Sequence, residues 1–419
     1  MKLAPGTPLS ISLAFDPARP RLPVGRLGMD SGLAQLEWSR EVIARKLTVA
    51  GLLYPPEAGL QAARGRAFEG LHGFLADSLP EGWGYLLMRK RLAKLGMDIA
   101  GLTPLERLAL IGEHGRGALV FEPSTTPSED VETLDLDLLA DEATALLTGE
   151  ESRLADTLAG LAGGSGGARP KVHVGFDGLG GVSFGEGEIA PGHAAWLVKF
   201  RAPQDPVDIG PIEEAYAVMA QAAGLALSAH RLIQARRGPG YFATKRFDRT
   251  DGGGRLHMIS LAGAIEAPSS VPSTSYDMFL RATRAITRRA DDVAEVFRRM
   301  VFNVLASNRD DHTRQHAYLM DAGGDWRLAP AYDLTYSPGP GGEHYMDIAG
   351  EARRPTRAHV TSLGTSHSFS PRQVAGVIDE VRAAVADWSR FSKQAGVTAA
   401  STKAIGQTLV RVWSDFEAP

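Results

Sequence analysis

The hydrophobic pattern of the chain changes near residue 248, and this change limits the folds that the chain can adopt. Before this point, the segments VHVGF, AAWLVKF and YFATKRF have the short apolar runs that are typical of β-strands. After it the pattern is mainly helical, and residues 291–306 place apolar side chains on one helix face, with Asp291 or Asp292 as the expected N-cap. This order predicts an α+β fold in which a strand-rich lobe leads into a helical lobe, an architecture that forms a cleft.

Two other patterns occupy the first part of the chain. Residues 8–53 alternate apolar and polar positions, which predicts short strands joined by tight turns. From about Ala76 to Gly112 the apolar positions recur with a helical period, and Asp77 or Ser78 is the expected N-cap. We therefore expect mixed strand and helix ahead of the strand-rich lobe.

The polar, acidic, proline-containing segment 122–132 is the predicted connection between this first region and the lobes. A chain of 419 residues is too long for one typical core, which favours subdomains. We expect a mixed β and helical region at 1–122, a strand-rich lobe at 123–248 and a helical lobe at 249–419.

The composition argues against several classes of function. The chain has no cysteine, which excludes disulfides, thiolate zinc sites and a cysteine nucleophile. Its net charge of −4 does not favour a strongly basic nucleic-acid surface. We see no signal-peptide pattern and no apolar run of membrane-spanning length, so we expect a cytoplasmic protein with no membrane partner.

The stretch SNRDDHTRQHAYL, residues 307–319, places acids, histidines, arginines and an amide between a predicted helix and a predicted β-hairpin. Because a hairpin brings its two ends together, Asp333 in APAYDLTYS is expected to return beside Asp310 and Gln315. Carboxylate and amide oxygens of this kind suit Mg²⁺, and an additional free carboxylate suits the acceptance of a proton from a hydroxyl group.

The same stretch has two other interpretations. Clusters of Asp, Asn and Arg after a helix often only cap the helix and form turns. Alternatively, Asp310, Asp311 and His312 could hold a transition metal, because carboxylate and imidazole are ordinary ligands, although adjacent residues rarely bind one ion together. The choice depends on which other residues the fold brings to this loop.

The segment GGSGGARPK, residues 163–171, could cradle phosphate groups. Its backbone N–H groups would face the phosphates while Arg169 and Lys171 neutralise their charge. It lacks the GKS or GKT of a Walker A motif, and a glycine-serine run is also typical of a flexible loop.

Lys199 lies in the apolar strand AAWLVKF and must reach water, an acid or a phosphate, because burying it unpaired is costly. Glu213 or Glu214, at the start of the next predicted helix, could pair with it. The alternative is an edge strand whose lysine faces solvent. The order of these parts along the chain, from glycine loop to second aspartate, is that of a protein-kinase-type phosphotransferase.

At this point the chain resembles the HipA family of serine/threonine kinases, the toxins of bacterial type II toxin–antitoxin pairs. LADSLPEGWGYLLMRK (75–90) is similar to the N-terminal signature of that family, and GGARPK to its glycine-rich loop. WLVKF, YFATKRFDR, NRDDHTRQH and LAPAYDL resemble its nucleotide lysine strand, hinge, catalytic loop and metal-binding segment. The resemblance spans nearly the whole chain and implies a two-lobed, protein-kinase-like fold of the HipA type.

The resemblance also implies residue roles. Asp310 is the expected catalytic base, with His312 and Arg314 helping to hold the loop and the phosphates, and Asp333 and Gln315 are the expected Mg²⁺ ligands. The expected ATP-binding residues are Gly164, Ser165, Gly166, Gly167, Ala168, Lys171, Lys199, Glu213, Lys245, Arg246 and Phe247. Ser165 is also the candidate for the inactivating autophosphorylation known in this family.

One position departs from the family pattern. Gln315 stands where the family usually has asparagine, and its extra methylene moves the amide oxygen by about an ångström, whereas Mg²⁺ demands a near-ideal shell. The loop could adapt, a water could bridge the gap, or activity could be reduced.

The resemblance implies an ATP- and Mg²⁺-dependent protein kinase that acts on a translation factor such as an aminoacyl-tRNA synthetase. Its expected partner is a HipB-like helix-turn-helix antitoxin, through which operator DNA would mainly be bound. Two alternatives are a weakly active or inactive kinase fold that serves as an antitoxin-bound co-repressor, and a small-molecule kinase. A metal-dependent hydrolase built around Asp310, Asp311 and His312 is a further alternative.

Overall fold

The computed structural model describes residues 3–4, 6–125, 134–162, 167–179, 181–184 and 189–418. An antiparallel sheet of order β4-β3-β2-β1-β5 forms the N-terminal region. Its strands are β1 (Leu9–Leu13), β2 (Leu22–Asp30), β3 (Leu33–Trp38), β4 (Leu60–Ala62) and β5 (Leu119–Glu122). The strands expected within 8–53 are confirmed as far as Trp38, but the expected strand at 44–53 is wrong. Lys46 adopts a left-handed conformation there and ends a helix, α1 (Arg40–Arg45).

The same region contains three more α-helices and one 3₁₀ turn. These elements are α2 (Gly73–Ala76), α3 (Gly82–Lys94), η1 (Ile99–Gly101) and α4 (Pro104–Ile111). Helix α3 begins at Gly82 with Glu81 as its N-cap, so the expected caps Asp77 and Ser78 are wrong. The Asp77 carboxylate accepts hydrogen bonds from Ser260, 183 residues away, rather than from its own helix.

A second antiparallel sheet follows, with the order β7-β6-β8-β10-β9. Its strands are β6 (Lys171–Phe176), β7 (Val182–Ser183), β8 (Ala194–Lys199), β9 (His230–Ile233) and β10 (Tyr241–Lys245), which confirms the strands expected at VHVGF, AAWLVKF and YFATKRF. Two helices, α5 (Leu136–Thr148) and α6 (Ala155–Ala162), share an apolar core with β6, β8 and β10, whereas α7 (Ile209–Ala222) follows β8.

The rest of the chain is mainly helical around a small sheet of order β11-β12-β13. Its elements are β11 (His257–Ser260), α8 (Leu261–Ile265), α9 (Tyr276–Thr287), α10 (Ala290–Leu305), η2 (Thr313–Gln315), β12 (Ala317–Met320), β13 (Trp326–Leu328), η3 (Pro340–Gly342), α11 (Arg357–Ser366), α12 (Pro371–Ala386), α13 (Trp388–Ala395) and α14 (Ala399–Phe416). The expected hairpin is confirmed as β12–β13. Arg289 precedes the long helix α10, and Asp291 and Asp292 lie in its first turn rather than at its N-cap.

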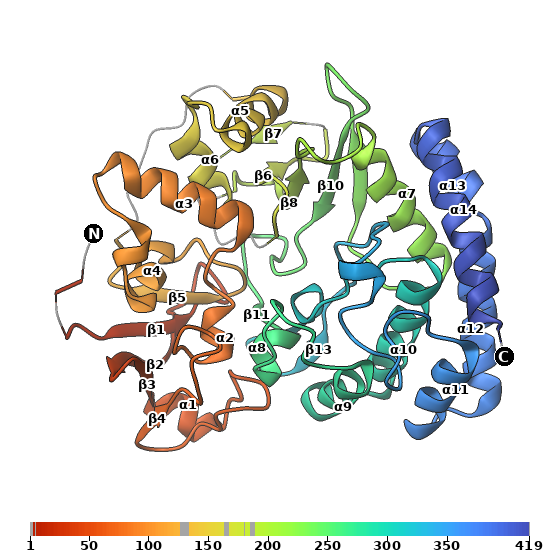
Figure 1. Ribbon diagram of the computed structural model, residues 1–419. Coiled ribbons are helices and arrows are strands. Elements are labelled where there is room, and N and C mark those ends of the chain that lie inside the picture. Colours follow the sequence, from red (N-terminus) through yellow and green to blue (C-terminus); the bar gives the residue numbers. More distant parts are fainter. Residues whose placement is uncertain are drawn as a thin grey trace.

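Figure 1 shows the strand-rich parts and the helical part side by side, with α12, α13 and α14 as an outer layer far from the N-terminal sheet. One apolar core joins that sheet to the helical part and includes Leu119, Ile259 and Phe302. The predicted α+β fold, strand-rich first and helical later, is therefore confirmed. In the described parts of the chain, no helix is long and apolar enough to cross a membrane.

Candidate functional site

A cleft of about 660 Å³ lies where the N-terminal region, the second sheet and the helical part meet. Most of the predicted site residues that the structure describes line it, namely Gly167, Ala168, Lys171, Lys199, Lys245, Arg246, Phe247, Asp310, His312, Arg314, Gln315 and Asp333. Glu213 lies behind this lining and contacts Lys199. Gly164, Ser165 and Gly166 lie outside the described residues.

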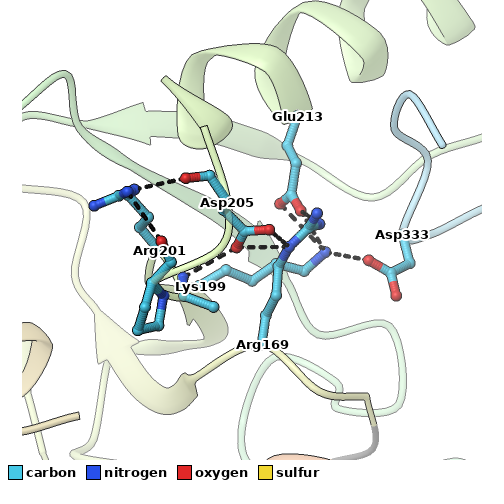
Figure 2. A network of polar contacts seen from close by, with 8 residues as sticks. Arg169, Lys199, Arg201, Asp205, Glu213 and Asp333 are labelled. Carbon is cyan, nitrogen blue, oxygen red and sulfur yellow. Dashed lines mark hydrogen bonds and ion pairs between the residues drawn. The ribbon is translucent and has the colours of Figure 1, made fainter. Parts of the chain in front are cut away.

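Lys199 ends strand β8, which lies between β6 and β10 in the sheet, so the interpretation as a solvent-facing lysine on an edge strand is wrong. Its buried Nζ lies 2.5 Å from Asp333 Oδ1 and 3.3 Å from Glu213 Oε2 (Figure 2). Burial alone would lower the pKa of Lys199, but the negative charges of Asp333 and Glu213 raise it above its ordinary value. Glu214, the other candidate partner, lies 2.9 Å from His230 instead.

Arg169 extends this ion network from the loop that precedes β6. One of its nitrogens lies 2.7 Å from Glu213 Oε1, and its Nε lies 3.0 Å from Asp205 Oδ2 (Figure 2). Glu213 is thus shared between a lysine and an arginine, and Asp205 fixes the arginine from the opposite side. No local pattern pointed to Asp205, which lies in an irregular loop.

Lys171 and Lys199 occupy directly opposite positions of the antiparallel pair β6–β8. Burial lowers the pKa of Lys171 to about 8, and the charge of Lys199 adds to this effect while Asp333 opposes it. Gly167 has a φ of +81°, which favours glycine there, and a Cβ added at this position would lie 2.8 Å from Lys171 Nζ, so this lysine would have to shift. Cations gathered in this way suit an anionic ligand in the cleft.

The two adjacent acids of the stretch 307–319 point in different directions. Asp310 lines the cleft with 48% of its side chain exposed, 3.8 Å from His312 Nε2. Asp311 is fully buried and accepts hydrogen bonds from Tyr276 Oη at 2.7 Å and from Tyr345 N at 2.9 Å. It also contacts His344 Nδ1 at 2.8 Å.

These different environments shift the pKa values of the two carboxyl groups in opposite directions. Burial raises the pKa of Asp310, and the charge of Asp333 raises it further against the opposing effect of His312. Burial would also raise the pKa of Asp311, but His344 and the hydrogen bonds lower it. Asp310 and Asp311 therefore cannot bind one metal ion together with His312. In the described residues, no group of three His, Cys, Asp or Glu side chains could hold a metal.

Asp333 returns beside the loop as the hairpin predicts, and Gln315 Nε2 donates a hydrogen bond of 3.0 Å to Asp333 Oδ2. Asp333 has a φ of +56°, a left-handed conformation that is uncommon outside glycine and enriched at functional sites. Burial would raise its pKa, but Lys199 and Lys171 hold the pKa well below the usual range, so the carboxylate is ionised. A carboxylate and an amide fit Mg²⁺, provided that Gln315 turns its amide oxygen, rather than its nitrogen, toward the ion.

The segment Lys245 to Phe247 lines the cleft at the end of β10, whose last residue is Lys245. Arg246 is fixed by Asp248 at 2.7 Å, and the Phe247 ring packs against Tyr332 with a centroid distance of 5.4 Å. This border is therefore a rigid one that combines an ion pair with an aromatic face.

The cleft also contains residues that the sequence did not single out as site residues. Glu81 and Arg116 reach it from the N-terminal region, and Tyr345 lines it beside His312, with ring centroids 5.4 Å apart. Glu81 lies within the N-terminal signature LADSLPEGWGYLLMRK. The match to that signature was the only sequence feature that could have pointed to Glu81 as a site residue. Its carboxylate lies 3.0 Å from Arg314 Nη1 in the stretch 307–319.

Two family profiles match the chain. The HipA N-terminal domain matches residues 20–122, and the HipA-like C-terminal domain matches residues 163–388. No curated protein matches the chain.

Among solved structures, HipA of Shewanella oneidensis MR-1, from a toxin–antitoxin complex with HipB and operator DNA, aligns with a TM-score of 0.68 at 15% identity. That alignment covers 97% of this chain and 96% of the other. The Helicobacter pylori proinflammatory kinase CtkA aligns over 53% of this chain and 88% of its own, at 14% identity and a TM-score of 0.38. The first alignment shows that the two chains share a fold over nearly their whole length.

Proposed function

Because the chain belongs to the HipA family, we propose that it is a serine/threonine protein kinase that transfers a phosphoryl group from ATP with the help of Mg²⁺. The convergence of Lys199, Asp333, Gln315 and Asp310 at one cleft carries this proposal. Phosphoryl transfer depends mainly on positioning and electrostatic stabilisation. These side chains supply, in the same order, a cation that faces the phosphates, a carboxylate and an amide that bind the metal ion, and a base.

Asp310 would accept the proton of the acceptor hydroxyl group. Its carboxylate is half exposed to the cleft, so an incoming hydroxyl can reach it, and its raised pKa brings it closer to the range in which a base works best. Lys199 and Lys171 would hold the phosphates, and Lys245 to Phe247 would border the adenine.

Asp333 and Gln315 would hold Mg²⁺, which supplies charge neutralisation at the phosphates when bound. In the structure both oxygens of the Asp333 carboxylate accept hydrogen bonds, one from Lys199 and one from Gln315. When the ion binds, the Lys199 ammonium would therefore move from Asp333 Oδ1 toward the phosphates.

Regulation and partners follow as further parts of the proposal. Ser165, in the glycine-rich loop, would be the site of inactivating autophosphorylation. The Shewanella protein was solved with HipB and operator DNA, and we infer a HipB-like helix-turn-helix antitoxin for this chain, with DNA bound mainly through it because the net charge is −4. The protein substrate would be a translation factor such as an aminoacyl-tRNA synthetase.

A second candidate function, that of an antitoxin-bound co-repressor with little kinase activity, rests on Gln315. Its amide nitrogen faces Asp333, and its side chain is longer than the asparagine of the family. This alternative predicts operator binding together with the antitoxin but no phosphate transfer.

The proposal is tested by the intact mass of the purified chain before and after incubation with Mg²⁺ and ATP. The kinase predicts the gain of a phosphoryl group that maps to Ser165 and is absent in Asp310→Ala. A gain in Gln315→Asn but not in the parent chain would favour the co-repressor. If no variant reacts with itself or with an added synthetase, and none binds ATP, the kinase proposal is wrong.

A further inference from the structure

The 77–83 segment, DSLPEGW, connects three separate parts of the cleft. It leads into the first turn of helix α3 in the N-terminal region, yet its contacts go to the helical part, to the catalytic loop and to the end of the glycine-rich loop. Glu81 and Gly82 line the cleft themselves. The segment belongs to the N-terminal signature of the chain, and the mechanism proposed above does not use it.

The first end of the segment is fixed to the helical part. Asp77 is buried and accepts hydrogen bonds from Ser260 N at 2.6 Å and from Ser260 Oγ at 2.7 Å. Ser260 caps helix α8, and Thr313 of the catalytic loop donates a hydrogen bond to Ala267 O just beyond that helix. Asp77 therefore anchors the segment to the elements that support the catalytic loop.

The middle of the segment contacts the catalytic loop directly. Glu81 occupies the N-cap position of α3, but its side chain makes no capping hydrogen bond. Its carboxylate forms an ion pair with Arg314, whose side chain is only 10% exposed. Glu81 thus supplies the negative charge that faces this mostly buried guanidinium, and Arg314 lines the same cleft as Asp310.

The last part of the segment contacts the end of the glycine-rich loop. Trp83 N donates a hydrogen bond of 3.0 Å to Gly167 O, and Trp83 Nε1 donates one of 3.1 Å to Lys171 O. Gly82 has a φ of +48°, and a Cβ at this position would lie 2.4 Å from Gly167 O. The backbone of Gly82 thus approaches the loop more closely than any other residue type could.

We propose that the 77–83 segment is a positioning element of the phosphotransfer site, in which Glu81 orients Arg314 while Gly82 and Trp83 hold Gly167, at the end of the glycine-rich loop, beside Lys171. This inference rests on the proposed function. It makes the N-terminal region a third wall of the site rather than a separate binding module. None of these residues takes part in the chemistry; they act through Arg314 and the loop.

The test compares Glu81→Gln with Glu69→Gln in the full chain. Glu69 belongs to the same region, pairs with Arg107, whose side chain is also 10% exposed, and does not line the cleft. Two quantities are measured: amide hydrogen exchange of residues 167–176 and 312–316 without ligand, and the single-turnover rate of phosphoryl transfer from Mg²⁺-ATP. Gly82→Ala is a second, stronger variant, and Glu81→Asp is the conservative variant expected to rescue part of the rate.

We expect Glu81→Gln to accelerate exchange at 312–316 and to slow transfer on the order of tenfold, because a displaced catalytic group loses rate steeply. Gly82→Ala should accelerate exchange at 167–176. If Glu81→Gln matches Glu69→Gln in both quantities, the inference is overturned. It is equally overturned if exchange changes but the rate does not, because the contacts are then only structural. A parent chain that binds no ATP removes the proposed function itself, and this is recognised before any variant is compared.

Discussion

Lys171 and Lys199 lie directly opposite each other on strands β6 and β8, both buried and both facing the same cleft. Like charges at directly opposite positions of a sheet are destabilising. The structure offsets this cost with the carboxylates of Asp333 and Glu213, and a bound polyphosphate would offset it further.

Replacing Lys199 by glutamine should weaken the binding of Mg²⁺-ATP about tenfold to a hundredfold, because a charge-assisted hydrogen bond to a phosphate is lost. Calorimetric titration measures the dissociation constant. Lys403→Gln, an exposed lysine on α14, is the matched control and should bind as the parent does. Equal affinities of the two variants would contradict the assignment of Lys199.

The affinity for Mg²⁺-ATP should fall as the pH rises through about 8, because burial lowers the pKa of Lys171 to about 8 and only its charged form attracts the phosphates. Below this pH the Lys171 ammonium is present, and above it the ammonium is lost. Titrations between pH 7 and pH 9 should show the decrease in the parent chain but not in Lys171→Arg, which keeps its charge. A parent affinity that is independent of pH would contradict this prediction.

The rate of phosphoryl transfer should fall on acidification with a midpoint above the ordinary carboxyl pKa. Asp310 must be ionised to accept a proton, and burial together with the charge of Asp333 raises its pKa. Single-turnover rates at saturating Mg²⁺-ATP across the acidic range provide the measurement. A rate that stays constant down to the ordinary carboxyl range would exclude Asp310 as the titrating base.

Asp311→Ala should lower the free energy of unfolding by about 3 kcal/mol, because it leaves Tyr276, His344 and the Tyr345 amide without their buried acceptor. Urea denaturation measures this change. Asp310→Ala, the adjacent and half-exposed acid, is the control and should change stability by less than about 0.5 kcal/mol. An equal loss of unfolding free energy in the two variants would contradict the assignment of Asp311, rather than Asp310, as the structural acid.

The Asp311 contribution should also depend on pH. Because the folded state lowers the pKa of this carboxyl, its stabilisation is present above the pKa of the unfolded chain and is lost as the pH falls through the folded value. The difference in stability between the parent and Asp311→Ala should therefore narrow on acidification, and a difference that widens would contradict this assignment.

Gln315→Asn should lower the Mg²⁺ concentration that gives half-maximal transfer, because the shorter amide matches the family geometry and Mg²⁺ tolerates little error in its shell. Gln315→Leu should lower the transfer rate on the order of tenfold or more, since Asp333 loses its amide neighbour. Magnesium titrations of the transfer rate compare the three chains. A Gln315→Leu chain that transfers as fast as the parent would show that the amide has no part in metal binding.

Local patterns were enough to predict much of the fold and the order in which the site segments follow one another along the chain. The strands at 172–176 and 194–199, the helix α10 and the hairpin that returns Asp333 to Gln315 all follow from periodicity and turn geometry. The partner of Lys199 was also predictable in part, since Glu213 lies on the helix that follows its strand.

Contacts between distant segments were not predictable from such patterns. Asp77 has the sequence features of an N-cap, but its carboxylate binds Ser260 from another part of the fold. Nothing local distinguishes Asp310 from Asp311, because the partners that hold Asp311 in the core are Tyr276 and His344, which lie elsewhere in the sequence. Asp205 and Arg169 meet only because two loops converge.

In the proposed kinase, Asp310 acts in the transfer step, whereas other residues of the cleft bind ATP. The most direct measurement determines, for the parent and for Asp310→Asn, both the dissociation constant of Mg²⁺-ATP and the amount of γ-phosphate transferred to protein. We expect Asp310→Asn to bind ATP within about threefold of the parent while transferring no detectable phosphate, since the loss falls on a step after binding. Transfer by Asp310→Asn at the parent rate would contradict it.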